Sequence, residues 1–286
     1  MTATAQPACA RAAGIAAWLA LLSAAALVGG CGSRPRADKA PAAVIATNSY
    51  LVCAAREFLD GEGAVAGLAG PGMCPGHFDL KPSQAAALRG SALLLRFDFQ
   101  ANLDERLAAF RGQGPGIAAV SLPEGLCIPS TYLQACRQVG EALVGAGLVA
   151  EPVAAERLKQ VQRRLEGLEK GIARSMGTSA GAKAPVLASG HQAAFCRHLG
   201  LDVVGTFSPS DTVGIGEMKD CLERARKAKV RCVVGNLQEG EAAAKRLSEL
   251  LGVPAVMFSN FPAMTGRQQS FDALVGDNVA LLAEVL

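Results

Sequence analysis

The stretch "APVLASGHQAAFCRHLGLDVVGTF", residues 184–207, decides the fold class because two predicted strands enclose a predicted helix. The apolar runs at 184–189 and 201–207 are short, as is typical of strands buried in a sheet. A Ser-Gly turn follows the first run and places His191 at the start of the intervening helix. Strands that alternate with helices in this way predict an α/β fold with mainly parallel sheets.

The same alternation continues on both sides of this stretch. Further apolar runs predict buried strands at residues 42–47, 92–97, 117–122, 230–236 and 254–260. Amphipathic segments between them predict helices at residues 82–88, 103–110, 216–228, 239–251 and 271–286. The strands form one group before residue 131 and another after residue 183, so the sequence predicts two Rossmann-like α/β lobes.

A long helical segment separates the two groups of strands. Apolar residues recur there at spacings of three and four, which gives one apolar helix face: Leu158, Val161, Leu165, Leu168 and Ile172. The opposite face is rich in Arg, Lys and Glu, with pairs such as Glu166 and Lys170, and is typical of a solvated surface. The sequence therefore predicts one long connecting helix from about Pro152 to Met176.

The N-terminal residues predict export and membrane attachment. Arg11 precedes an apolar run that ends in small residues just before Cys31, so residues 1–30 resemble a lipoprotein signal peptide and Cys31 the lipid-modified residue. A single transmembrane helix is the alternative, since the run is close to the ~20 residues that a bilayer requires. The first interpretation predicts a lipid-anchored protein at the periplasmic or extracytoplasmic face. The remaining chain divides into a flexible tether (31–42), an N-terminal lobe (43–130), a helical linker (131–183) and a C-terminal lobe (184–286).

The composition excludes some partners and leaves an odd number of thiols. The net charge is only +3 and aromatic residues make up 5% of the chain, so we expect no nucleic-acid binding. Nine cysteines are present. Without Cys9 in the signal peptide and the lipidated Cys31, an odd number remains: Cys53, Cys74, Cys127, Cys136, Cys196, Cys221 and Cys232. In an oxidising compartment at least one of them must be a buried free thiol or serve another purpose.

Three side chains are candidate metal ligands because of their position in the predicted topology. His77, Cys127 and His191 each follow a predicted strand or turn and precede a helix, which is where α/β sheets present ligand groups. Imidazole and thiolate from separate loops suit a divalent transition metal. His198 lies seven residues after His191, about two helical turns away, and we interpret it as structural.

The motifs around these residues carry a family resemblance. They are "CPGHFDLKPSQAAALRGSALLL" (74–95), "GLCIPSTYLQAC" (125–136) and "ASGHQAAFCRHLGL" (188–201). From about Ala43 to Leu286 the chain resembles the metal-binding lipoproteins of ABC importers for zinc and manganese. The resemblance implies two lobes joined by one long helix and places His77 and His191 on ligand positions. Cys127 stands where the family has a histidine.

Departures from the family pattern bear on the fourth ligand and on the metal. The family's aspartate after the last strand is replaced by Ser259 and Asn260, of which Asn260 could offer an amide oxygen. Cys74 could supply the missing ligand, or it could form a disulfide with Cys127. Thiols are gained while oxygen and nitrogen donors are lost, which favours zinc over manganese, with ferrous iron and copper as further alternatives.

The resemblance implies a function in metal uptake. We expect a monomeric, membrane-anchored solute-binding protein that captures a divalent metal ion between its lobes and delivers it to an ABC permease and its ATPase. One alternative is a lipoprotein that binds a chelated metal or another bulkier ligand with an eroded ion site. A zinc-dependent hydrolase is less consistent with the sequence, because no general base stands beside a candidate ligand. We therefore expect that the protein is not an enzyme.

Overall fold

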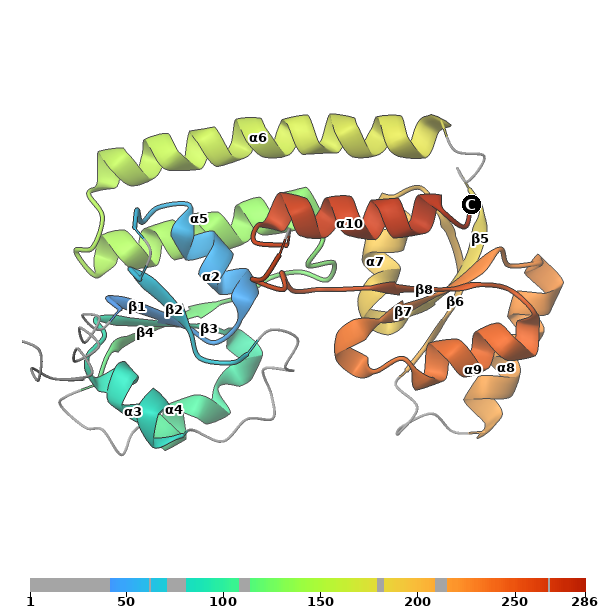
Figure 1. Ribbon diagram of the computed structural model, residues 1–286, viewed down its shortest axis with the longest axis horizontal. Helices are drawn as coiled ribbons and strands as arrows, with labels where there is room; N and C mark the ends of the chain where they lie inside the picture. The colour runs from blue at the N-terminus through green and yellow to red at the C-terminus, as the bar shows by residue number, and fades with distance from the viewer. Residues whose placement is uncertain are drawn as a thin grey trace, which may run out of the picture. The chain divides into compact units, whose positions relative to one another are not determined.

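Two four-stranded parallel sheets frame the computed structural model (Figure 1). The structure describes residues 42–61, 63–70, 81–107, 114–178, 183–208, 215–266 and 268–286, all within one compact unit, Pro41–Leu286. The predicted signal peptide, Cys31, Cys74 and His77 lie outside the described residues. Within the described ranges, no helix combines the length and the apolar character needed to cross a bilayer.

The two sheets have the same strand order. The first contains β1 (Val44–Ala46), β2 (Val65–Gly67), β3 (Leu93–Phe97) and β4 (Gly116–Val120) in the order β2-β1-β3-β4. The second contains β5 (Pro185–Ser189), β6 (Asp202–Phe207), β7 (Cys232–Asn236) and β8 (Ala255–Phe258) in the order β6-β5-β7-β8. All strand pairs are parallel. In each sheet the first strand lies between the second and third, and such a reversal of strand order opens a crevice at the carboxyl ends.

Helices cover the sheets and join them. The first lobe has α2 (Ser49–Arg56), α3 (Pro82–Arg89), α4 (Asn102–Leu107), α5 (Pro129–Gly145) and the 3₁₀ helix η1 (Asp98–Gln100). The second has α7 (Gly190–His198), α8 (Ile215–Ala228), η3 (Leu237–Glu239), α9 (Ala242–Leu251) and α10 (Phe271–Ala283). The predicted α/β class with two lobes and one long connecting helix is confirmed.

The connecting helix α6 (Glu151–Thr178) extends over 28 residues, or about 42 Å at 1.5 Å per residue. It packs against α5 of the first lobe and α10 of the second (Figure 1). The apolar face predicted from the spacing is the buried face: Val161, Leu165 and Ile172 are each less than 7% exposed. The helix thereby joins one continuous apolar core that includes strands of both sheets.

The lobes also meet through aromatic and charged side chains beneath α6. Tyr132 of α5 stacks on Phe271 of α10, with ring centroids 4.0 Å apart and planes 2° from parallel. Arg164 of α6 donates to both carboxylate oxygens of Glu57, at 2.9 and 2.6 Å, and its Nε lies 3.1 Å from Asp272. The Arg164 guanidinium therefore connects α6 with the end of α2 and with α10, and the ring stack connects α10 with α5.

The helix α2 and the strand β2 were not predicted, and two strands are less buried than expected. The helix α2 lacks an amphipathic period because seven of its eight residues are buried, and β2 is only three residues long. The prediction of buried strands at 117–122 and 201–207 is wrong in part. β4 and β6 are outer strands of their sheets, and each has one fully buried residue only, Val120 and Phe207.

The contact between α5 and Phe58, which follows the end of α2, gives a test of the first lobe's packing. A Cβ on Gly140 of α5 would lie 2.9 Å from two ring carbons of Phe58, whereas Gly145 in the same helix has no atom within 4 Å. We expect Gly140→Val to destabilise the protein by about 1–3 kcal/mol, because the rigid ring must move.

In a protein of this size such a change lowers Tm by about 2–4 °C per kcal/mol in thermal unfolding. The matched variant Gly145→Val should leave Tm unchanged or slightly raise it, because valine is a better helix residue than glycine. Equal Tm values for the two variants would contradict the tight contact.

Candidate functional site

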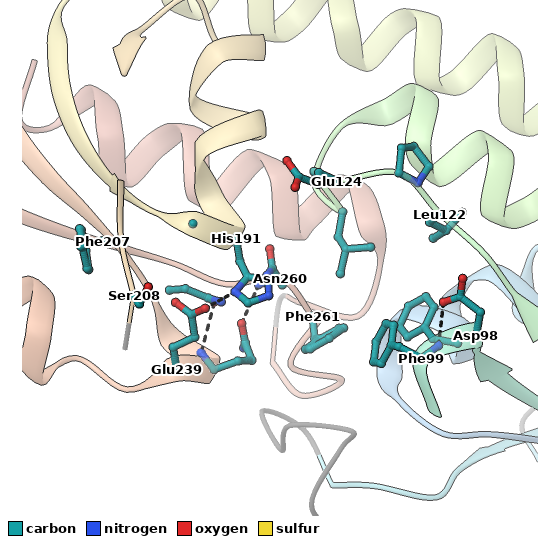
Figure 2. A pocket seen from close by; sticks show the side chains of 17 residues that line it. Asp98, Phe99, Leu122, Glu124, His191, Phe207, Ser208, Glu239, Asn260 and Phe261 are labelled. Carbon is teal, nitrogen blue, oxygen red and sulfur yellow. Dashed lines mark hydrogen bonds and ion pairs between the residues drawn. The ribbon is translucent and has the colours of Figure 1, made fainter. Parts of the chain in front are cut away.

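A cavity of about 540 Å³ lies at the carboxyl ends of the strands of both sheets (Figure 2). The residues that line it follow six of the eight strands. Asp98 and Phe99 come after β3, and residues 122–126 come after β4. From the second lobe, the lining includes residues after each of its four strands: His191, Ser208, Glu239 and Asn260 among them. The cavity is therefore where the topology of each sheet predicts a binding site.

His191 and Glu239 form a pair on the wall of the cavity that belongs to the second lobe. His191 begins α7 just after β5, and Glu239 ends η3 after the neighbouring strand β7, so the sheet brings both side chains together. Nδ1 of His191 is in direct contact with Oε1 of Glu239 (Figure 2). The carboxylate is 13% exposed, whereas the imidazole is 71% exposed. With Nδ1 engaged by the carboxylate, Nε2 is left as the free ring nitrogen.

The electrostatic surroundings favour the charged form of this imidazole. The hydrogen bond with Glu239 raises the pKa of His191 above its ordinary value. Partial burial acts in the opposite direction, and the negative charges of Glu239 and Glu124 add to the increase in pKa. Glu124 follows β4, so acidic side chains of both lobes act on one imidazole.

Asn260 lines the cavity after β8 and is fixed by its neighbours. Its backbone N–H donates to Oε1 of Gln238 at 2.8 Å, and its Oδ1 accepts from Nε2 of Gln192 at 3.0 Å. The side chain is 5% exposed. A carbonyl oxygen has two lone pairs, so Oδ1 retains the capacity for one further interaction.

Cys127 lies beneath Asn260 and is fully buried rather than part of the cavity lining. Its Sγ donates to the carbonyl oxygen of Ser259 at 3.2 Å, accepts from Nδ2 of Asn278 at 3.5 Å, and lies 3.8 Å from Oδ1 of Asn260. Burial raises the pKa of the Cys127 thiol to about 12, and the hydrogen bond from Asn278 opposes this increase. The Cys127 thiol is free in the structure. Cys74, the partner in the alternative of a disulfide, lies outside the described residues, so that alternative stays a prediction.

The structure brings some of the predicted ligands to the cavity and leaves others elsewhere. His191 and Asn260 line it, Cys127 is one layer behind Asn260, and His77 and Cys74 are outside the described residues. In the part of the chain that the structure describes, no three His, Cys, Asp or Glu side chains are close enough to bind a metal together. The predicted set His77, Cys127, His191, Cys74 and Asn260 therefore stays a prediction.

Sequence reasoning missed Glu239 and placed His198 correctly among the structural residues. The signal for Glu239 is an acidic residue three positions after Asn236, the last residue of β7. The 3₁₀ turn of η3 returns that residue to the strand end. His198 contacts Glu169 of α6 instead, with 3.1 Å between Nε2 and Oε2, and it does not line the cavity.

Comparison with known proteins identifies the family that has this architecture. The family model for ZnuA, described as a periplasmic zinc-uptake complex component A, matches residues 44–285. The chain belongs to the ZnuA family. That family is one of binding components for uptake, so the protein is not an enzyme.

Solved structures of ZnuA-like fold agree in architecture at low sequence identity. The periplasmic zinc-binding protein TroA of Treponema pallidum has a TM-score of 0.69 at 15% identity, over 85% of this chain and 98% of its own. A mutant of the laminin-binding adhesin Lmb of Streptococcus agalactiae has a TM-score of 0.71 at 12% identity, over 86% and 99%. A manganese-bound periplasmic metal-binding protein of Candidatus Liberibacter asiaticus reaches 0.66 at 11% identity, over 84% and 98%. No curated protein sequence gives a significant match.

The contact between His191 and Glu239 predicts a measurable change in the titration of His191. We expect Glu239→Gln to lower the pKa of His191, because the neutral amide removes the negative charge and weakens the hydrogen bond that stabilise the imidazolium. Histidine resonances in an NMR pH titration report this directly. His198, which contacts Glu169 and not Glu239, serves as the internal control. An unchanged pKa of His191 would show that the two side chains do not interact in solution.

The burial of Cys127 predicts resistance to alkylation. Reaction requires the thiolate, which a pKa of about 12 makes scarce at neutral pH, and the sulfur is shielded from solvent. We expect iodoacetamide to leave Cys127 unmodified in the folded protein and to modify it in denaturant, as measured by peptide mass spectrometry. Rapid modification of the folded protein would show that the thiol faces the cavity.

Proposed function

We propose that the protein captures a divalent transition metal ion, zinc in the first place, in the cavity and delivers it to an ABC importer. One observation carries this proposal: in a chain of the ZnuA family, His191 lies in the cavity with its Nδ1 held by the carboxylate of Glu239. Metal-binding histidines usually have this arrangement, in which a carboxylate fixes the tautomer and the other ring nitrogen binds the metal.

The ligands that we propose come from both lobes. Nε2 of His191 and the amide oxygen of Asn260 act from the second lobe, and the predicted ligand His77 acts from the first. Zinc commonly takes four ligands drawn from nitrogen, sulfur and oxygen. An ion that is bound in this way would connect the lobes. Its affinity would depend on how closely the ligand atoms of both lobes approach one point.

The support for Cys127 and Cys74 as metal ligands is weaker than the support for His191. A cysteine binds metal as the thiolate, and the buried Cys127 thiol is protonated and donates to Ser259. Its ionisation would have to be supported by the binding free energy of the metal. We therefore propose that Cys127 remains a buried, protonated thiol when a metal binds at His191. The resemblance favours the opposite, because it places Cys127 on the position of a family histidine.

The choice of zinc follows from the donor type and from the family. Imidazole suits zinc, copper and ferrous iron, whereas manganese prefers carboxylate and water. The family description names zinc uptake, TroA is described as zinc-binding, and relatives from Candidatus Liberibacter asiaticus were solved with manganese and with cadmium.

The proposed place of action is the membrane surface outside the cytoplasm. The family description is that of a periplasmic component. The small residues that precede Cys31 support export followed by lipid attachment at that cysteine, with residues 31–42 as the tether. A protein held in this way would deliver its cargo to a permease and ATPase in the same membrane.

The proposal predicts different outcomes for two histidines of the same helix. We expect one zinc ion per chain, and we expect His191→Ala to weaken binding by more than the 10–100-fold typical for loss of an outer-shell partner. His198→Ala removes an imidazole from the other end of α7 and should leave the zinc affinity unchanged. Native mass spectrometry gives the stoichiometry and competition titration the affinity. Equal affinities for the two variants, or no zinc bound by the wild type, would refute the proposal.

A further inference from the structure

A buried glutamine lies directly behind the cavity wall that carries His191. Gln192 is the next residue of α7, is 0% exposed, and does not line the cavity. Its Nε2 donates to Oδ1 of Asn260 at 3.0 Å and lies 3.5 Å from Oδ1 of Asn236. The start of one helix therefore carries a proposed metal ligand and, beside it, a side chain that contacts a second proposed ligand.

The contacts of Asn260 show which way its amide faces. Both atoms close to its Oδ1, Nε2 of Gln192 and Sγ of Cys127, belong to fully buried side chains that do not line the cavity. Since Oδ1 and Nδ2 occupy opposite arms of the amide, Nδ2 is directed away from these two partners, on the side of the cavity that Asn260 lines (Figure 2). An NH₂ group only donates hydrogen bonds, so a metal can bind this side chain only after the amide turns over.

Gln192 has a free acceptor that can stabilise the opposite orientation of Asn260. Its Oε1 is buried and has no hydrogen-bond partner among the described residues. A terminal amide torsion is broad and roughly two-fold, so a turn of about 180° is accessible to both side chains. After both amides turn, Oε1 of Gln192 accepts from Nδ2 of Asn260, and Oδ1 of Asn260 faces the cavity.

The balance between the two orientations depends on the ion. The exchange keeps the hydrogen bond between Gln192 and Asn260, with donor and acceptor reversed, and gives up the longer contact with Asn236. Oδ1 of Asn236 still accepts from the backbone N–H of Gln238 at 3.3 Å. The structure without a ligand has the inward orientation of Oδ1, and an ion that binds only the outward orientation shifts the population toward it.

We infer that Gln192 is a positioning residue for the metal site and acts through Asn260. It holds the amide of Asn260 with Oδ1 inward when the cavity is free, and it accepts from Nδ2 when Oδ1 binds the ion. This inference rests on the proposed function, because it assigns how one ligand of the same ion is oriented.

The test measures zinc affinity by competition titration for the wild type, Gln192→Met, Asn260→Ala and the double variant. We expect Gln192→Met to weaken binding by about tenfold, at the lower end of the effect of losing an outer-shell partner, because methionine cannot hold the outward amide. Asn260→Ala should weaken binding at least as much. In the Asn260→Ala background, Gln192→Met should cause no further loss, because its effect passes through Asn260.

A second variant keeps the shape of the side chain. Gln192→Glu places two oxygens behind Asn260, which only accept hydrogen bonds when the carboxylate is ionised and so favour the outward orientation of Oδ1. We expect this variant to bind zinc at least as tightly as the wild type. A loss of affinity equal to that of Gln192→Met would overturn the inference.

Nuclear magnetic resonance gives a signal that packing alone would not change. We expect zinc to slow the solvent exchange of the side-chain NH₂ of Asn260 in the wild type, because this group then donates to Gln192 in the interior. The slowing should be absent in Gln192→Met. Equal slowing in both proteins would overturn the inference.

The titrations separate the inference from the proposed function. If the wild type binds zinc and Gln192→Met binds it equally well, or weakens it equally in the Asn260→Ala background, the inference is overturned and the proposed capture of zinc stands. The same holds if Asn260→Ala leaves the affinity unchanged. If the wild type binds no zinc, the proposed function fails and the inference fails with it.

Discussion

The stack of Tyr132 on Phe271, together with the Arg164 guanidinium of α6, is the contact on which the arrangement of the two lobes depends. The rings come from α5 and α10, one from each lobe, and their planes are nearly parallel at 4.0 Å. Arg164 adds charged hydrogen bonds to Glu57 and an ion pair with Asp272. Tyr132 also donates its hydroxyl to Glu57 at 3.0 Å, so the stack and the charged group form one network.

This network constrains how the cavity can open and close. A helix of 28 residues that packs on both lobes and shares their core does not bend without loss of buried apolar contacts. Large hinge motion, as in binding proteins whose lobes are joined by loops, is therefore disfavoured. We therefore expect the cavity to change shape mainly through the segments that follow the strands. These segments carry His191, Glu239 and Phe99.

The sequence was sufficient for the fold and for part of the site. Apolar runs and helical spacing predicted seven strands and the long helix, since these patterns depend on which residues are buried. The helix α2 was missed because burial of nearly all its residues removes the amphipathic period, although Asn48, which accepts from the N–H of Leu51 at 3.0 Å, is a recognisable N-cap. The position of His191 at the cavity was predicted because it follows the end of a strand closely, and the carboxyl ends of the strands are where such sheets bind ligands.

The direction of a loop side chain was not encoded in such patterns. Gly125 has φ of +87°, and a Cβ there would lie 2.5 Å from Cδ1 of Ile128. The tight turn that this glycine permits is followed directly by Cys127, whose thiol is buried in the interior while residues 122–126 line the cavity. An alignment that places a cysteine on a histidine position cannot detect this difference, because it compares positions and not side-chain directions.

The replacement of the family's aspartate by Asn260 fits the surroundings of that position. Nε2 of Gln192 donates to its Oδ1, and the backbone N–H of Asn260 donates to Gln238, so the amide is held in one orientation at the cavity. The position thereby loses a negative charge. Glu239, Glu124 and Asp98 keep the cavity acidic, and among the described residues no three metal donors lie around one point. The cavity therefore attracts a cation through the field of several separated carboxylates, while the contact that Asn260 offers comes from a neutral amide oxygen.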